Sequence, residues 1–165
     1  MQQELANLIT VLEEQRDIQA ALVGLSEKKI AVIATGDVGA LNEVTEQESA
    51  MVARIAAVER KQTACVTALA TFMGIPAAQL RMQAVITAAR GSHKQHLITL
   101  RDELTSLVEK QVKYNDMNRR LLEMNMEHIQ FLLNRNGIEK AAPTYGSDGD
   151  VQQLRAQIRL LDRKV

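Results

Sequence analysis

Residues 41–72 read LNEVTEQESAMVARIAAVERKQTACVTALATF, and this stretch decides the fold. Ten positions, alternately three and four residues apart, are apolar with two polar exceptions: Leu41, Val44, Glu48, Met51, Ile55, Val58, Gln62, Cys65, Leu69 and Phe72. This repeat is typical of a long helix that packs against other helices as in a coiled coil. It predicts a continuous helix over about 38–73. Gly74 suits a helix C-terminus, and Pro76 blocks continuation.

Two more long helices follow from the same kind of spacing. Over about 3–35, one apolar row contains Leu8, Val11, Ile18, Leu22, Leu25 and Val32, and a second contains Leu5, Ile9, Leu12, Val23, Ile30 and Ile33. Gly36 and Asp37 then suit a tight turn into the next helix. A third helix over about 93–134 carries Leu97, Leu100, Leu104, Leu107, Gln111, Tyr114, Asn118, Leu121, Asn125, His128 and Leu132. A short helix over about 77–89 crosses between, and Ser92 is the expected N-cap of the last helix.

These elements predict an all-α fold. At about 1.5 Å per residue, each long helix spans roughly 50 to 60 Å, which is too long for a sphere. We therefore expect an elongated antiparallel coiled-coil bundle of three long helices plus a short crossover helix and a C-terminal tail. The bundle is assigned to residues 1–137, and residues 138–165 are expected to be a flexible arm that carries a C-terminal amphipathic helix.

The last fifteen residues, VQQLRAQIRLLDRKV, have coiled-coil spacing of their own. The apolar positions are Val151, Leu154, Ile158, Leu161 and Val165, and the basic ones are Arg155, Arg159, Arg163 and Lys164. A helix of this length is marginal alone in water, so it needs something to bind. One hypothesis is that this segment fills an apolar groove of its own bundle until a partner displaces it.

Composition argues against several classes of protein. Twenty basic residues balance twenty acidic ones, so no net positive charge favours binding to nucleic acid or anionic lipid. A single cysteine allows no internal disulfide, and no signal peptide or membrane-length apolar run is found. A soluble cytoplasmic protein without direct membrane insertion is expected.

The sequence offers little for catalysis. No Glu-x-x-His pair, phosphate loop, nucleophile elbow or dinucleotide fingerprint occurs. His93 and His96 are three residues apart but have no cysteine or carboxylate at a spacing suitable for a shared metal. Cys65 occupies an apolar row, where it is expected to act as a small core residue. We predict no enzyme activity, no metal, no cofactor and no small-molecule substrate.

A polar row lies within the apolar face of the third long helix. Gln111, Asn118 and Asn125 are seven residues apart, between Leu104 and Leu132. Two explanations remain open. Buried carboxamides can fix the register of a bundle at some cost in stability. Alternatively, this face binds a partner and is wet when the partner is absent.

Two motifs carry a resemblance to a known family. NDMNRRLL contains Asn115, Asn118, Leu121 and Leu122 in an N-x-x-N-x-x-L-L pattern, and TYGSDG over 144–149 contains a Tyr-Gly-x-x-Gly pattern. Weaker agreement covers SEKKIAVIATGDVGAL and LATFMGI. With three long helices and about twenty residues between the two motifs, the chain resembles the FlgN family, the cytoplasmic export chaperones for flagellar hook-filament junction proteins, which are also called hook-associated proteins.

The resemblance implies a chaperone that binds the C-terminal amphipathic helices of these junction proteins, keeps them unassembled and delivers them to the type III export gate. It implies client binding by the C-terminal part, for which the candidates are Asn115, Asn118, Leu121, Leu122, Asn125, Leu154, Ile158 and Leu161. Tyr145 and Gly146 are the candidates for docking to the cytoplasmic domain of the gate. Without the resemblance, Tyr145 is either a loop residue packed on the bundle or an anchor for a partner's pocket.

Two other hypotheses compete with the export chaperone. A self-associating coiled-coil adaptor or structural spacer would have similar seams, and a C2 homodimer is the commonest form of self-association. A four-helix cofactor or metal protein is the third, and it lacks ligands. Binding to a junction protein's C-terminal helix separates the chaperone from the adaptor.

Overall fold

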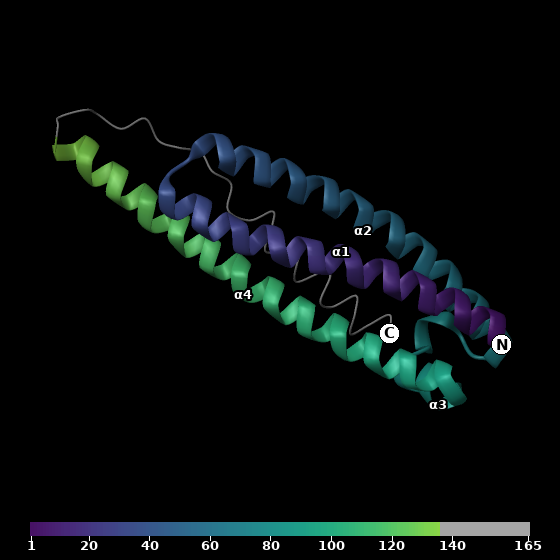
Figure 1. Ribbon diagram of the computed structural model, residues 1–165. Coiled ribbons are helices and arrows are strands. Elements are labelled where there is room, and N and C mark those ends of the chain that lie inside the picture. Colours follow the sequence, from purple (N-terminus) through teal and green to yellow (C-terminus); the bar gives the residue numbers. More distant parts are fainter. Residues whose placement is uncertain (136–165) are drawn as a thin grey trace.

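The computed structural model describes residues 1–135, which form an all-α bundle (Figure 1). The elements are α1 (Gln2–Thr35), α2 (Val38–Met73), the 3-10 helix η1 (Ala77–Gln79), α3 (Met82–Ala88) and α4 (Gly91–Arg135). The expected all-α class is confirmed. The predicted arm over 138–165 lies outside the described residues.

Glycines end the first two long helices in the way their sequence indicates. Gly36 and Gly74 both have φ of 69°, in the left-handed region that closes a helix C-terminus with little strain for glycine. The carboxylate of Asp37 then accepts a hydrogen bond of 2.9 Å from the backbone N–H of Ala40. This cap starts α2 directly after α1, so the two helices form a tight hairpin.

The crossover differs from the single helix expected over 77–89. It consists of η1 and α3, and the backbone of Leu80 and Arg81 between them is extended. This break places the Leu80 side chain in the core, where it is fully buried, so tertiary packing outweighs one more turn of helix. The last helix also begins at Gly91 rather than near residue 93. Ser92 consequently lies within α4 and is not its cap.

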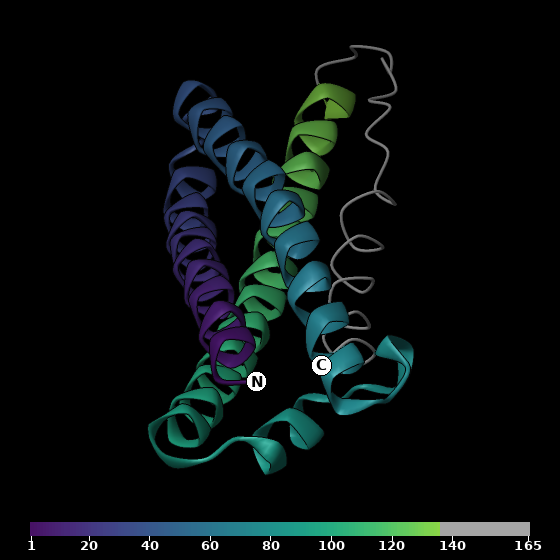
Figure 2. The ribbon, with the colours of Figure 1, turned by 90° about the vertical axis from the view of Figure 1, so that its right-hand side faces the viewer.

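The main apolar core lies at the end of the bundle that the crossover closes (Figure 2). It combines side chains from α1, α2, the crossover and α4, namely Leu5, Leu8, Ile9, Leu12, Leu69, Ala70, Leu80, Met82, Val85, Ile86, Ala89, Leu97, Leu100 and Leu104. A second cluster joins α1 to α2 further along and contains Val11, Ile18, Leu22, Ile55 and Val58. We call the crossover end the closed end.

Helix α1 lies between α2 and α4 and packs against both (Figure 1). Within residues 1–135, α2 and α4 do not pack against each other along their lengths. Consecutive long helices run antiparallel, so α1 and α4 run parallel. Two polar contacts show this direction: His96 Nε2 lies 3.1 Å from Glu13 Oε1, and Arg16 Nη1 lies 3.4 Å from Glu103 Oε2. The closed end is therefore a shared core, whereas the opposite end depends on α1 as the central helix.

Candidate functional site

The contact between α1 and α4 follows two heptad rows that run in register. The α1 row is Leu5, Leu12, Gln19, Ser26 and Ile33, and the α4 row is Leu97, Leu104, Gln111, Asn118 and Asn125. Each α4 position is 92 residues after its α1 partner, a separation shown directly by the hydrogen bonds from Asn118 to Ser26 and from Asn125 to Ile33. The interface is therefore leucine-rich at the closed end and becomes polar towards the other end.

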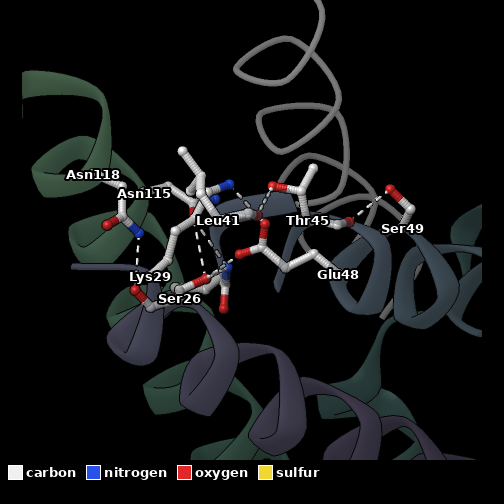
Figure 3. Close-up of polar contacts among 9 residues, drawn as sticks. Ser26, Lys29, Leu41, Thr45, Glu48, Ser49, Asn115 and Asn118 are labelled. Atoms are coloured by element: carbon white, nitrogen blue, oxygen red, sulfur yellow. Dashed lines mark hydrogen bonds and ion pairs between the residues drawn. The ribbon is translucent and has the colours of Figure 1, made fainter. Parts of the chain in front are cut away.

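A buried polar cluster forms where the interface changes character (Figure 3). Its members come from all three long helices, and we call them the Ser26 cluster: Ser26, Lys29, Glu48, Gln111, Asn115 and Asn118. Gln111 Nε2 donates to Ser26 Oγ at 2.7 Å and to Asn115 Oδ1 at 3.1 Å. Asn118 Nδ2 donates to the Ser26 carbonyl oxygen at 2.8 Å. Two carboxamides of the predicted polar row thus bind the same residue of α1.

An ion pair links this cluster to α2. Lys29 Nζ lies 2.7 Å from Glu48 Oε2, and both side chains are largely buried. The Ser26 hydroxyl has one proton to donate, and its two acceptors, Glu48 Oε1 and Asn115 Oδ1, are each 3.3 Å away. Removing one partner of such a network leaves a buried polar group unsatisfied, which costs more than the bond itself contributes.

These contacts pair Ser26 of α1 with two particular carboxamides of α4. A slip of α4 by one heptad would bring Gln111 or Asn125 opposite Ser26 in place of Asn118 and would break the hydrogen bonds that Gln111 and Asn118 donate to it. Burying these carboxamides costs stability even in the native register, because Gln111 Oε1 and Asn118 Oδ1 are buried and accept no hydrogen bond within residues 1–135. We expect the polar row to favour this register at some expense of stability.

Ser26→Ala tests the contribution of the cluster. The substitution removes the acceptor of the 2.7 Å bond from Gln111, so we expect the free energy of unfolding to fall by about 1–3 kcal/mol. Urea denaturation followed by circular dichroism measures it. Ser49→Ala is the matched control, because Ser49 is exposed and its hydroxyl bonds only the Thr45 carbonyl of its own helix. Equal stability losses for the two variants would contradict the role of the cluster.

The structure separates the predicted motif residues by their surroundings. Asn118 is buried and Asn115 is half-buried, and both belong to the Ser26 cluster. Asn125 is exposed but donates to the Ile33 carbonyl oxygen at 3.1 Å. Leu121 is half-buried and Leu122 is exposed. The predicted site residues Tyr145, Gly146, Leu154, Ile158 and Leu161 lie outside the described residues.

Sequence reasoning missed the α1 partner of the carboxamides. Ser26 and Gln19 are buried, although the two apolar rows predicted over residues 3–35 include neither of them. The signal was present, because both lie seven residues from the next member of the row Leu5, Leu12, Gln19, Ser26 and Ile33. Polar residues at a strict seven-residue spacing in two helices are the feature that would have paired them.

Helix α4 continues past the end of α1, with an apolar surface. Thr35, the last residue of α1, corresponds to Glu127 in the 92-residue register, so residues 128–135 extend about 12 Å further (Figure 1). The exposed large apolar side chains from Leu122 onward are Leu122, Met124, Ile129, Phe131, Leu132 and Leu133. We call these six residues the end surface. All six lie within twelve consecutive residues. Exposed apolar side chains that are concentrated in one part of a surface often mark an interaction site.

The rest of the described chain offers little for chemistry. Residues 1–135 contain no group of three His, Cys, Asp or Glu side chains that could hold a metal ion. Burial raises the pKa of the Cys65 thiol, which is the opposite of what activates a nucleophile. No helix within 1–135 is long and apolar enough to cross a membrane. Six of the twelve exposed large apolar side chains in residues 1–135 belong to the end surface.

Comparison with known proteins identifies the family. A family model described as FlgN protein matches residues 1–153. The chain belongs to the FlgN family. No curated protein and no solved structure matches it. The FlgN match includes the Ser26 cluster, all of α4 and the tail motif at 144–149, and it ends one residue before Leu154.

Membership of the FlgN family gives the general function. FlgN proteins are flagellar export chaperones that bind hook-associated proteins, so this chain is a chaperone of flagellar assembly. The FlgN match does not say which surface of the bundle a client contacts.

Proposed function

We propose that this chain is a cytoplasmic chaperone that holds the C-terminal amphipathic helix of a hook-filament junction protein on the end surface of α4 and delivers it to the type III export gate. The observation that supports this most is the run of exposed apolar side chains beyond the end of α1. An amphipathic helix binds another helix through anchors at i, i+3, i+4 and i+7 spacing, and α4 offers such positions from Leu122 to Leu133.

The motif residues have two roles in this proposal. Asn115 accepts a hydrogen bond from the Ser26 hydroxyl and Asn118 donates one to the Ser26 carbonyl, so both hold α4 against α1 and keep the end of α4 projecting as a rigid rod. Leu121, Leu122 and Asn125 form the edge of the client site next to α1. A client whose apolar face is buried here cannot use that face to assemble, so binding keeps the client monomeric until export.

Titration of the full chain with the C-terminal helix of a junction protein tests the proposal. We expect a saturable complex, measured by calorimetry, with a negative heat-capacity change because apolar surface is buried. A scrambled peptide of the same composition is the control. If the intact, folded chain binds neither junction-protein helices nor the junction proteins themselves, the proposal is wrong.

Tyr145 is proposed to dock at the gate, because tyrosine is a frequent hot-spot residue at protein interfaces and this one lies in the tail motif. Tyr145→Ala is expected to leave the client dissociation constant unchanged and to weaken binding to the cytoplasmic domain of the gate about tenfold or more. Surface plasmon resonance with immobilised gate domain measures this. Tyr114→Ala is a control on α4. Loss of client binding with Tyr145→Ala would assign Tyr145 to the client site instead.

A self-associating adaptor is the second candidate function, because the same end surface would suit a second copy of the chain. The two functions differ in how many copies of the chain form a complex when client is present. Light scattering over a range of concentrations is expected to give the mass of one copy of the chain with the added client helix. An adaptor would instead form dimers that persist in the presence of client. Such dimers would favour the adaptor.

A further inference from the structure

One stripe of α4 continues the buried face into solvent. Leu122, Met126, Ile129 and Leu133 follow one another at intervals of four, three and four residues. Leu122 and Ile129 continue the heptad row of Val108 and Asn115, which faces the bundle, but both are exposed since α1 ends nearby. We call these four residues the end stripe. It is the part of α4 best shaped to take one more helix.

We propose that residues 151–165 of the same chain cover the end stripe in the free protein and that a client helix displaces them. The proposal extends the proposed function, since it names what regulates the client site. The family match ends at residue 153, so the match does not account for the apolar positions that follow. Three arguments identify this segment as the occupant.

The first argument is the spacing of the apolar side chains. Leu154, Ile158, Leu161 and Val165 follow one another at intervals of four, three and four residues, the same intervals as the end stripe. Each set covers eleven residue steps, about 16 Å of helix. Two helices with equal apolar repeats over equal lengths can bury both stripes against each other.

The second argument is charge. Residues 151–165 contain four basic residues, Arg155, Arg159, Arg163 and Lys164, and one acidic residue, so their net charge is +3. Glu123 and Glu127 are exposed beside the end stripe, and neither forms an ion pair with another residue of 1–135. Opposite charges favour this pairing over one between two copies of residues 122–133, which contain two glutamates and no lysine or arginine. The attraction weakens as salt is added.

The third argument is the length of the connection. The fifteen residues 136–150 can span at most about 50 Å when extended, and the end stripe reaches only about 20 Å back from the end of α4. A tethered segment of this kind binds at an effective concentration in the millimolar range. If it covers about nine molecules in ten, the apparent affinity for a client is about tenfold lower than the affinity of the open chain.

A tryptophan probe on the stripe tests the coverage in the full chain. The protein contains no tryptophan, so Ile129→Trp reports on one position. In this background the apolar tail residues are replaced in the triple variant L154S/I158S/L161S, and the matched control is Q152S/Q153S/A156S. We expect the indole emission to shift to longer wavelength in the triple variant alone. An unchanged spectrum, or an emission maximum that depends on protein concentration as pairing of two copies requires, would overturn the proposal.

A client titration in the native Ile129 background tests the displacement. We expect the triple variant to bind the junction-protein helix about tenfold more tightly than the unsubstituted chain and its control. Equal affinities would overturn the displacement. If no version binds client, the proposed function fails, but the emission comparison still decides whether the tail covers the stripe. The two failures are therefore distinguishable.

Discussion

Replacing Ile129 and Leu133 together by serine is expected to weaken binding of a junction-protein helix roughly 10- to 80-fold without unfolding the bundle. The two side chains lie one turn apart on the same side of α4 and are 51% and 37% exposed, so a client helix can remove these parts of them from water. For side chains that are exposed to this extent, the burial energy is about 0.7–1.3 kcal/mol each, and two such losses amount to about 1.3–2.6 kcal/mol.

The same substitutions have little to remove from the folded state. Neither side chain belongs to a core cluster, and serine has a helix propensity within a few tenths of a kcal/mol of those of isoleucine and leucine. We expect the free energy of unfolding to change by less than about 0.5 kcal/mol, measured by urea denaturation. Calorimetric titration measures the affinity.

A matched control uses apolar residues that are exposed elsewhere. Val38 and Phe72 lie at opposite ends of α2 and are 68% and 58% exposed. Val38→Ser with Phe72→Ser removes a comparable pair of exposed side chains, and client affinity is expected to stay within about twofold. If the control pair weakens binding as much as the Ile129 and Leu133 pair, nonspecific contact with exposed apolar side chains rather than the end surface would explain the affinity.

Leu100→Ala is expected to lower the free energy of unfolding by about 2–5 kcal/mol, the second large effect. Leu100 is fully buried in the core of the closed end, where α1, α2, the crossover and α4 meet. The truncation leaves a cavity between elements that cannot all move to fill it. For a domain with a total stability of about 5–15 kcal/mol, this is a large fraction.

Leu132→Ala is the internal control for that prediction. It makes the same truncation on the same helix, but Leu132 is 40% exposed on the end surface. We expect a loss below about 1 kcal/mol, and both variants are compared by urea denaturation with circular dichroism. Similar losses for the two variants would mean that the end of α4 carries as much of the folded stability as the closed end, which contradicts the described core.

The sequence predicted the long helices well because their determinants are local. The apolar rows over 3–35, 38–73 and 93–134 predicted the three long helices, and the glycines at 36 and 74 predicted the ends of the first two. The repeat was less informative about burial at its end. Phe72 belongs to the row but is exposed, whereas Ala70 is buried. A straight helix drifts about 20° per heptad relative to a 3.5-residue repeat, so the buried side moves off the row over 31 residues.

Contacts between residues far apart in the sequence determine which residues the polar row faces and where the crossover bends. The row Gln111, Asn118 and Asn125 was visible, but its two explanations could not be separated without knowing that Ser26 and Ile33 lie opposite. The hydrogen bonds show that these carboxamides contact α1, and a role in client binding stays a prediction. The extended backbone at Leu80 could also not be predicted from the sequence, because the core that buries Leu80 comes from helices distant in sequence.

Hydrogen–deuterium exchange of the full chain, with and without a saturating junction-protein helix, tests the central claim most directly. The claim is that the client binds the end surface of α4. The account predicts that added client slows amide exchange in residues 121–135 and leaves the closed end, around Leu97 to Leu104, unchanged. Slower exchange at the closed end or along α2, with residues 121–135 unaffected, would contradict it.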